Sequence, residues 1–222
     1  MNETDSLDVH SVEIGGMRWC ENRLWLALAG QPMVAAYDPN TDQAQLILRF
    51  SHPVTTICPS DEGLWLIAGG GKLGRRLVLW SLDERRPLRE FDCPDGAAGG
   101  MALEAGNVWL THPNNRKLFC LDRAEGKVRW MIRTSMETYS PDYQAGALWL
   151  VERDPGPLGH WGRGREARCF FIRYDTARET VAERLAVPFT PRCMALDGDR
   201  FWYAEEGREG FASIARRELA RR

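Results

Sequence analysis

The chain contains no long hydrophobic run, and no segment approaches the roughly 20 apolar residues that a membrane-spanning helix requires. Its first ten residues are acidic and lack the apolar core of a secretory signal peptide. The chain has no large excess of acidic or basic residues. Its formal net charge of −2 produces no overall electrostatic field that would attract nucleic acid or a membrane. These absences predict a cytoplasmic protein with no nucleic-acid partner and no membrane partner.

Paired cysteines are also missing. The six cysteines are scattered and none forms a Cys-x-x-Cys pair, which argues against a zinc knuckle or a thioredoxin-type site. Without an export signal, free thiols in a reducing compartment are the expectation. The sequence also contains no nucleophile elbow, no dinucleotide fingerprint and no Ser-His-Asp order, so no familiar catalytic motif suggests a reaction.

The chain contains one sequence motif that occurs five times, each time with a tryptophan near its centre. The copies are NRLWLALAG at 22–30, EGLWLIAGG at 62–70, GNVWLTHPN at 106–114, GALWLVERD at 146–154 and DRFWYAEEG at 199–207. The tryptophans are 40, 44, 40 and 53 positions apart. Periods in this range indicate repeated supersecondary units that bury their faces against one another.

Each unit reads as four short strands. An apolar run such as GMALE precedes the tryptophan strand through a short turn, which predicts a hairpin. A third run follows, such as KLFCLD, and a fourth, such as TVAERLAV, closes the unit. Four third runs end in aspartate, whose side chain suits a turn because it bonds backbone amides two residues on. These aspartates are Asp38, Asp83, Asp122 and Asp175.

The fifth unit lacks a fourth run, and the N-terminal segment LDVHSVEI at 7–14 alternates apolar and polar residues. We therefore expect this segment to complete the last unit and cover its edge. The fold class expected is all-β: a five-bladed β-propeller with four antiparallel strands per blade, formed by residues 1–222 as one domain. The five tryptophans would fill the core between neighbouring blades.

The strand LWLA followed by VAAYDPNTDQ or KLFCLDRAEGK resembles the blades of the quinoprotein-type and streptogramin-lyase-like propellers. The resemblance spans nearly the whole chain and implies the propeller fold. It implies no activity and no catalytic residue, because these motifs specify the blade rather than a site. The signature dipeptides of WD40 repeats are absent from the sequence.

Ligands of propellers usually meet the face made by two sets of loops, around the mouth of the central channel. The loops from the second to the third strand are 29–33, 68–76, 111–116, 152–168 and 205–210. The loops from the fourth strand to the next blade are 15–17, 51–54, 92–99, 134–140 and 187–192. Irregular residues gather in these loops, whereas the opposite turns are short and uniform, so we expect the site here.

The longest of these loops is 152–168, which contains two prolines and four glycines. His160 and Trp161 with Arg163 would cover the channel mouth, the aromatic ring stacking on a planar ligand and the arginine holding an anion. A plain solvated loop is the alternative. The glycine-rich segment 68–76 invites a phosphate-binding interpretation, but its spacing and context differ from the P-loop, which favours an ordinary flexible turn.

Two metal-binding arrangements remain open. His52, His112 and His160 lie on the ligand face and could form a zinc or iron site. Cys20, Cys58 and Cys193 lie on the first strands of consecutive blades, and Met101 and Met194 also lie on first strands. These sulfur groups could line one arc of the channel as copper(I) ligands or supply a reactive thiol. For the cysteines we favour the simpler interpretation, in which they are small buried hydrophobic residues.

The function expected is that of a binding module, which engages a small ligand or a protein partner at the channel mouth. The alternative is a channel-mouth enzyme of lyase, cyclising or hydrolytic type, with or without a bound metal, in which loop 152–168 is the lid. No cofactor or catalytic residue is assigned, and the basic C-terminal segment SIARRELARR is expected to be a solvated end. The candidate ligand-binding residues are His52, Arg75, His112, Arg116, Glu152, His160, Trp161, Arg163, Arg192 and Glu205.

Overall fold

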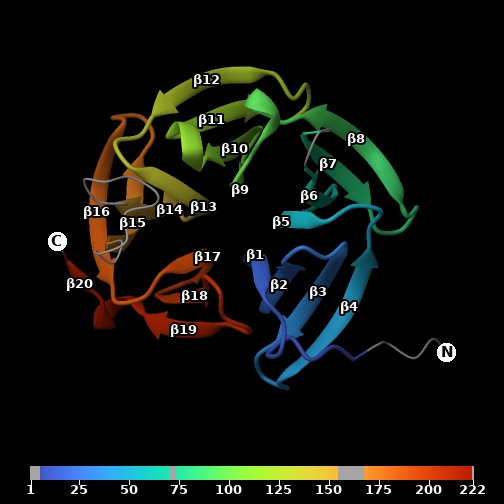
Figure 1. Cartoon of the computed structure of the whole chain (residues 1–222). Helices are drawn as coiled ribbons and strands as arrows, with labels where there is room; N and C mark the ends of the chain where they lie inside the picture. The colour runs from blue at the N-terminus through green and yellow to red at the C-terminus, as the bar shows by residue number, and fades with distance from the viewer. Residues whose placement is uncertain (1–5, 71–73, 155–167, 222) are drawn as a thin grey trace.

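The computed structural model describes residues 6–70, 74–154 and 168–221, which form five β-sheets arranged as the blades of a ring (Figure 1). Every sheet is antiparallel and meanders outward from the centre in chain order. The five-bladed β-propeller predicted from the tryptophan period is therefore confirmed. The innermost strands β1, β5, β9, β13 and β17 surround the central channel (Figure 1).

The strands match the runs read from the sequence to within a few residues. The first blade contains β1 (Ile14–Cys20), β2 (Arg23–Leu28), β3 (Met33–Asp38) and β4 (Gln43–Arg49). The second contains β5 (Val54–Ser60), β6 (Gly63–Gly69), β7 (Arg75–Ser81) and β8 (Arg86–Asp92). The third contains β9 (Gly100–Glu104), β10 (Asn107–His112), β11 (Lys117–Asp122) and β12 (Val128–Arg133).

The last two blades depart from four strands each. The fourth contains β13 (Glu137–Gln144), β14 (Ala147–Asp154), β15 (Arg168–Asp175) and β16 (Thr180–Val187). The fifth contains β17 (Pro191–Asp197), β18 (Arg200–Glu205) and β19 (Ala212–Ala215). After a single 3₁₀ turn, β20 (Ala220–Arg221) leaves the fifth blade and pairs with β16. The fourth sheet thus has five strands and the fifth has three.

In three of the four blades with a predicted turn aspartate, that aspartate accepts hydrogen bonds from backbone amides of the outer turn, and in the second blade a serine does so instead. Oδ1 of Asp38 accepts a hydrogen bond from the amide of Asn40 at 2.9 Å. Asp122 and Asp175 hold the equivalent turns through the amides two and three residues ahead. In the second blade the strand ends two residues earlier than expected, so the Ser81 hydroxyl takes this role, accepting from Glu84 N at 3.0 Å, in place of the predicted Asp83.

Each pair of neighbouring blades encloses its own hydrophobic cluster. Trp65 and Trp109 are fully buried in these layers, and Trp149 is buried beside Phe201. Trp25 and Trp202 are half-buried and pack against the edges of their clusters. The repeated tryptophans are therefore core residues, as predicted, and the ring is held by burial between sheets.

The predicted closure by the N-terminal strand is wrong. Residues 7–13 form no strand, and the segment leans on the first blade instead, through a bridge from Ser6 to Gln45 and a bond from Leu7 N to Ala44 O at 3.2 Å. It still touches the fifth blade, because Val12 O accepts from Gly210 N at 2.8 Å. Val9 is buried with residues of both blades. The segment thus closes the ring as an apolar wedge rather than as a strand.

The C-terminal segment is not the solvated end that we expected. It carries β19, turns once, and returns to the fourth blade as β20, with Leu219 buried between the fourth and fifth blades. The reason is its amphipathic spacing, which places leucine inward among outward arginines. In the part of the chain that the structure describes, no helix is long and apolar enough to cross a membrane.

Candidate functional site

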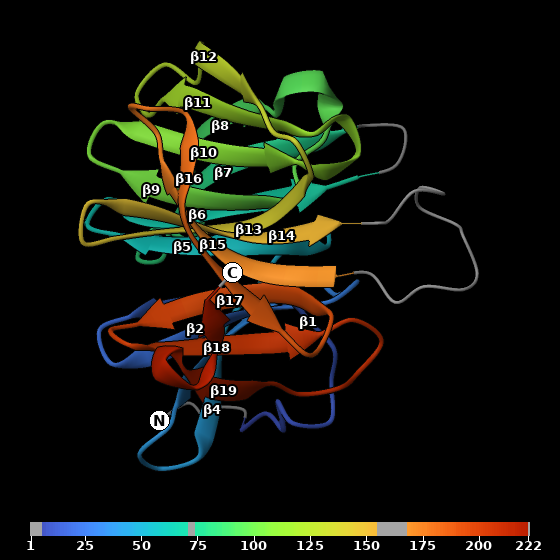
Figure 2. The ribbon, with the colours of Figure 1, turned by 90° about the vertical axis from the view of Figure 1, so that its left-hand side faces the viewer.

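A cavity of about 620 Å³ opens where the channel meets the loops between blades. All five blades contribute to its wall, including glycines and short backbone stretches that leave room for a ligand. Its charged and aromatic lining consists of Arg75, His112, Tyr139, Arg192 and Glu206. Figure 2 shows that the turns connecting the strands lie on two opposite faces of the ring. The cavity lies on the face formed by the loops that follow β2, β6, β10 and β18.

His112 ends β10, where the following 3₁₀ turn, Pro113–Asn115, holds its ring at the cavity wall. The residue is only 7% exposed. Its Nε2 lies 3.4 Å from the Asn115 amide nitrogen, while Nδ1 is buried without a hydrogen-bond partner among the described residues. The His112 ring lines the cavity, so its polar edge can contribute to the binding of a ligand there.

Two arginines bring positive charge to the same cavity from opposite blades. Arg75, at the start of β7, donates through Nη1 to the carbonyl of Ala98 and makes no ion pair within the described ranges. Arg192, on β17, pairs with Glu13 at 2.8 Å. Because Arg75 uses only part of its five-donor guanidinium group, the remaining donors are available to an anionic ligand.

Tyr139, Arg153 and Glu206 form a linked group on the opposite rim. The guanidinium of Arg153 lies 4.8 Å from the centre of the Tyr139 ring and 2.7 Å from Glu206 Oε2. The Tyr139 hydroxyl donates to Glu137 Oε2 at 2.7 Å, and burial together with this carboxylate raises the pKa of Tyr139. The phenol therefore stays protonated at neutral pH, with its proton donated to Glu137, while the residue forms part of the cavity wall.

An ion pair crosses the channel deeper in the ring. Arg18 lies three residues beyond the cavity-lining Gly15 on β1, about 10 Å further along the strand. It donates through Nη1 to Asp142 on β13 and through Nη2 to the carbonyl of Tyr143 at 3.1 Å. Burial raises the pKa of Asp142 against the opposing effect of Arg18. This pair gives the channel a polar floor below the mouth.

Three of the predicted site residues meet at this cavity, namely Arg75, His112 and Arg192. His160, Trp161 and Arg163 lie outside the described residues, as does most of the proposed lid. His52 lines a separate groove of about 250 Å³ beside Phe50. Arg116 is exposed and reaches the carbonyl of Ser135 at 3.4 Å.

The two predicted glutamates lie away from the mouth. Glu152 is buried inside the fourth blade, where it pairs with Arg184 at 2.7 Å. Glu205 lines an outer groove between the fourth and fifth blades and pairs with Arg208 at 3.3 Å. The alternation of strand side chains explains this, because Glu206, one residue later, is the one that reaches the channel side.

The arc of sulfur ligands is not formed. Cys58 and Met101 lie in the cluster between the second and third blades, whereas Cys193 lies between the fifth and first, with its Sγ 3.9 Å from the carbonyl oxygen of Ile14. These thiols are small buried hydrophobic groups, the interpretation that the sequence favoured. Among the described residues, no three His, Cys, Asp or Glu side chains gather as a metal site would require.

The sequence reasoning missed Tyr139, Arg18 and Asp142. For the last two a signal existed, because a charged residue within an innermost strand of a propeller must face either the channel or a buried partner. Tyr139 is the third residue of β13 and Glu206 follows the last residue of β18, so a bulge between Tyr139 and Asp142 and the exact end of β18 decide where the two side chains point. Neither feature is legible in the residue pattern.

Comparison with known proteins supports the architecture. No protein-family description matches the sequence, and neither does any curated protein. Among solved structures, a chain in the crystal structure of a mitotic checkpoint complex superposes with a TM-score of 0.57 at 10% identity, covering 96% of this chain and 94% of that one. That complex contains a β-propeller of WD40 type. At this identity the likeness shows the fold alone, and the chain is similar to a β-propeller over nearly its whole length.

Proposed function

We propose that the protein is a binding module that takes a small polar ligand with an anionic group into the channel mouth. The observation that carries this proposal is a cavity of about 620 Å³ at the channel mouth, with the His112 ring in its wall. Arg75 and Arg192 line the same cavity and supply positive charge. The buried Arg18–Asp142 pair lies deeper in the channel than the cavity and limits how far a ligand enters.

The mixed charge of the rim favours a ligand with neutral hydrogen-bonding groups beside its anionic group. Glu13 and Glu206 engage Arg192 and Arg153, so these carboxylates discriminate against molecules that carry several negative charges. Tyr139, which also lines the cavity, offers a side-chain contact for the uncharged part. A hydroxy acid or an amino acid meets these requirements.

The test is a thermal-shift screen of organic acids, amino acids and sugar phosphates, followed by calorimetric titration of any compound that stabilises the protein. Arg75→Ala and His112→Ala should each weaken the binding at least tenfold, about 1.4 kcal/mol. Arg178→Ala is the matched control, because Arg178 is exposed in a turn between β15 and β16. A ligand that binds equally well to all variants would refute the assignment of the mouth.

Three further statements rest on sequence and stand as proposals: that residues 1–222 form one domain, that the protein is cytoplasmic, and that it belongs among the quinoprotein-type and streptogramin-lyase-like propellers. The blade phrase supports the last of these. Protein partners are proposed as well, since loops displayed on a rigid ring suit them.

A further inference from the structure

The fifth blade ends at an open edge. Its strand β19 pairs with β18 on one side, and in the part of the chain described here no strand pairs with its other side (Figure 1). The first three blades have a fourth strand in this position, and in the fourth blade even the outer strand is capped by β20. The described residues therefore leave one strand position of the fifth blade unfilled, away from the channel mouth, and this position is independent of the function proposed for the mouth.

The backbone of this edge is arranged to receive a strand. Arg216 N donates to Asp199 O at 2.7 Å, and the register of β18 with β19 continues from this bonded pair. In an antiparallel ladder, bonded and non-bonded pairs alternate. Ser213 and Ala215 consequently direct their backbone N–H and C=O groups away from β18. An edge strand with outward donors and acceptors is a template for pairing with another chain.

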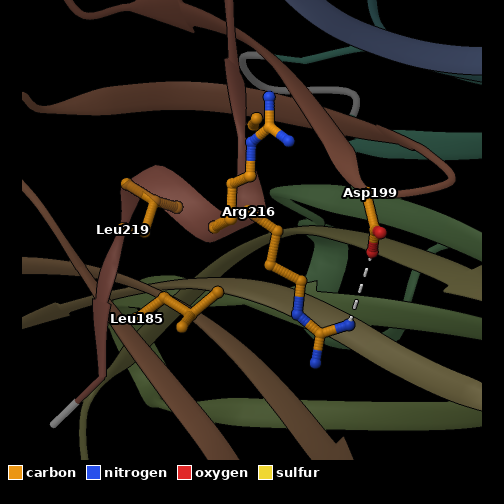
Figure 3. Close-up of a pocket in the computed structure, with 6 residues that line it drawn as sticks. Leu185, Asp199, Arg216 and Leu219 are labelled. Atoms are coloured by element: carbon orange, nitrogen blue, oxygen red, sulfur yellow. Dashed lines mark ion pairs between the residues drawn. The ribbon is translucent and has the colours of Figure 1, made fainter.

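A groove of about 580 Å³ lies at the end of β19 (Figure 3). It is lined by Leu185, Asp199, Ala215, Arg216, Arg217 and Leu219. Figure 3 shows the Leu185 and Leu219 side chains close together and the guanidinium of Arg216 directed toward Asp199, at 3.9 Å. The groove thus combines an apolar floor with positive charge.

The two arginines of this groove differ in the ion pairs that they form. Arg216 also pairs with Glu183 on β16, so its charge is compensated within the protein. Arg217 is exposed and makes no ion pair with any residue in the described ranges. A carboxylate arriving with an added strand would pair with Arg217.

We infer that β19 binds an extended, acidic segment of a partner protein, which adds to the fifth blade as its fourth strand. Backbone bonds to Ser213 and Ala215 would hold the segment, an acidic side chain would meet Arg217, and an apolar one would enter the groove beside Leu219. A second copy of β19 fits less well. Pairing Ser213 with Ala215 of that copy places Arg217 opposite a phenylalanine, Phe211, and leaves its charge unpaired.

The probe is the synthetic peptide LDVHSVEI, which alternates apolar and polar residues and carries two acidic side chains. It is titrated into the ¹⁵N-labelled full chain, and amide shifts are followed by NMR. The amides of Ser213 and Ala215 should shift on binding and become protected from hydrogen exchange. Shifts confined to Ala44 and Gln45 would place the peptide on the first blade and overturn the inference, as would no shift at millimolar peptide.

Two variants and two peptides sharpen the test. Ala215→Pro removes an outward N–H without touching the bonds to β18 and should weaken binding at least tenfold, whereas Ala212→Ser should not change it. Arg217→Glu should weaken the acidic peptide and favour a peptide in which both acids are replaced by lysine. Equal binding of the acidic and lysine peptides to the unmodified chain would refute the role of Arg217. A dimer in sedimentation that Ala215→Pro abolishes would identify a second copy as the occupant and overturn the inference.

Discussion

Arg18 on β1 donates to the carboxylate of Asp142 on β13, and so joins two blades that are not neighbours in the ring. The other oxygen of Asp142 accepts from Leu196 N at 2.8 Å, which adds the fifth blade to the same contact. Ser140 bonds Met194 in the same manner, through its hydroxyl at 2.9 Å. Side chains of β13 thus take the part of a backbone ladder between the fourth and fifth blades, and Arg18 fixes them from across the channel.

Removing one member of this pair should be costly, because it leaves the other as an uncompensated buried charge. We expect Asp142→Asn to lower the free energy of unfolding by about 3 kcal/mol. Adding Arg18→Met should recover much of that loss, since the asparagine oxygen can still accept from Leu196 N and no buried charge remains. Urea unfolding of both single variants and the double variant measures the coupling. Strictly additive losses would show that the two residues do not interact.

The interblade tryptophans provide a second prediction with an internal control. Trp109 is 0% exposed and contacts Trp130, which is 42% exposed, at 5.8 Å between ring centres. Trp109→Ala should cost about 3–5 kcal/mol, the usual range for emptying a large aromatic site. Trp130→Ala, on the outer strand β12, should cost much less. Comparable losses in chemical denaturation would contradict the assignment of Trp109 to the core.

If the N-terminal segment 7–13 closes the ring, a small truncation of its buried side chain should lower the free energy of unfolding. Val9 is 2% exposed between the first and fifth blades, whereas Ser11 is exposed nearby. Val9→Ala should lower the free energy of unfolding by about 2 kcal/mol through lost burial and the cavity left behind. Ser11→Ala should stay within about 0.5 kcal/mol of the wild type. If Val9→Ala were equally neutral, the segment would not close the ring.

Glu152 predicts a particular dependence of stability on pH. Burial raises the pKa of Glu152 above 4.5, the value of an exposed glutamate, although Arg184 opposes the shift. Between the pKa of about 4.5 in the unfolded state and the higher pKa in the folded state, the folded state binds more protons than the unfolded state. The contribution of Glu152 to the free energy of unfolding therefore falls as the pH rises through this interval.

The variant Glu152→Gln removes this titration. The stability of the wild type relative to the variant should therefore decline as the pH rises from about 4.5 toward neutrality. Thermal or urea unfolding of both proteins at several pH values in that window provides the comparison. A relative stability of the wild type that grows with pH would mean that Arg184 outweighs burial.

Much of this fold was predictable because a blade is a local object. The tryptophan phrase, the hairpin turn and the aspartate that begins the outer turn all lie within about 44 residues, so the sequence pattern alone predicts the five sheets. Closure was not predictable in the same way. The alternation of apolar and polar residues in 7–14 indicates that one side of this segment is buried, but it does not indicate which blade covers that side. Val9 is buried between the first and fifth blades although the segment forms no strand.

The site was predictable only in part. Loop positions on the proposed ligand face led to Arg75, His112 and Arg192, and all three line the cavity at the channel mouth. Glu205 was chosen in place of Glu206 because the two differ only by the parity of the strand end. Arg18 and Asp142 are 124 positions apart, and their contact depends on the ring having closed.

Ligand binding at the channel mouth can be tested directly through the histidines. The chain has only four, so their imidazole NMR signals are readily assigned by substitution. His10 serves as an internal reference, since it packs against Tyr37 and lies 3.0 Å from Asp42 in the N-terminal wedge. On titration with a stabilising compound from the screen, we predict that the His112 signals shift in a saturable manner while those of His10 stay unchanged. A compound that binds tightly and leaves His112 unmoved would contradict the account.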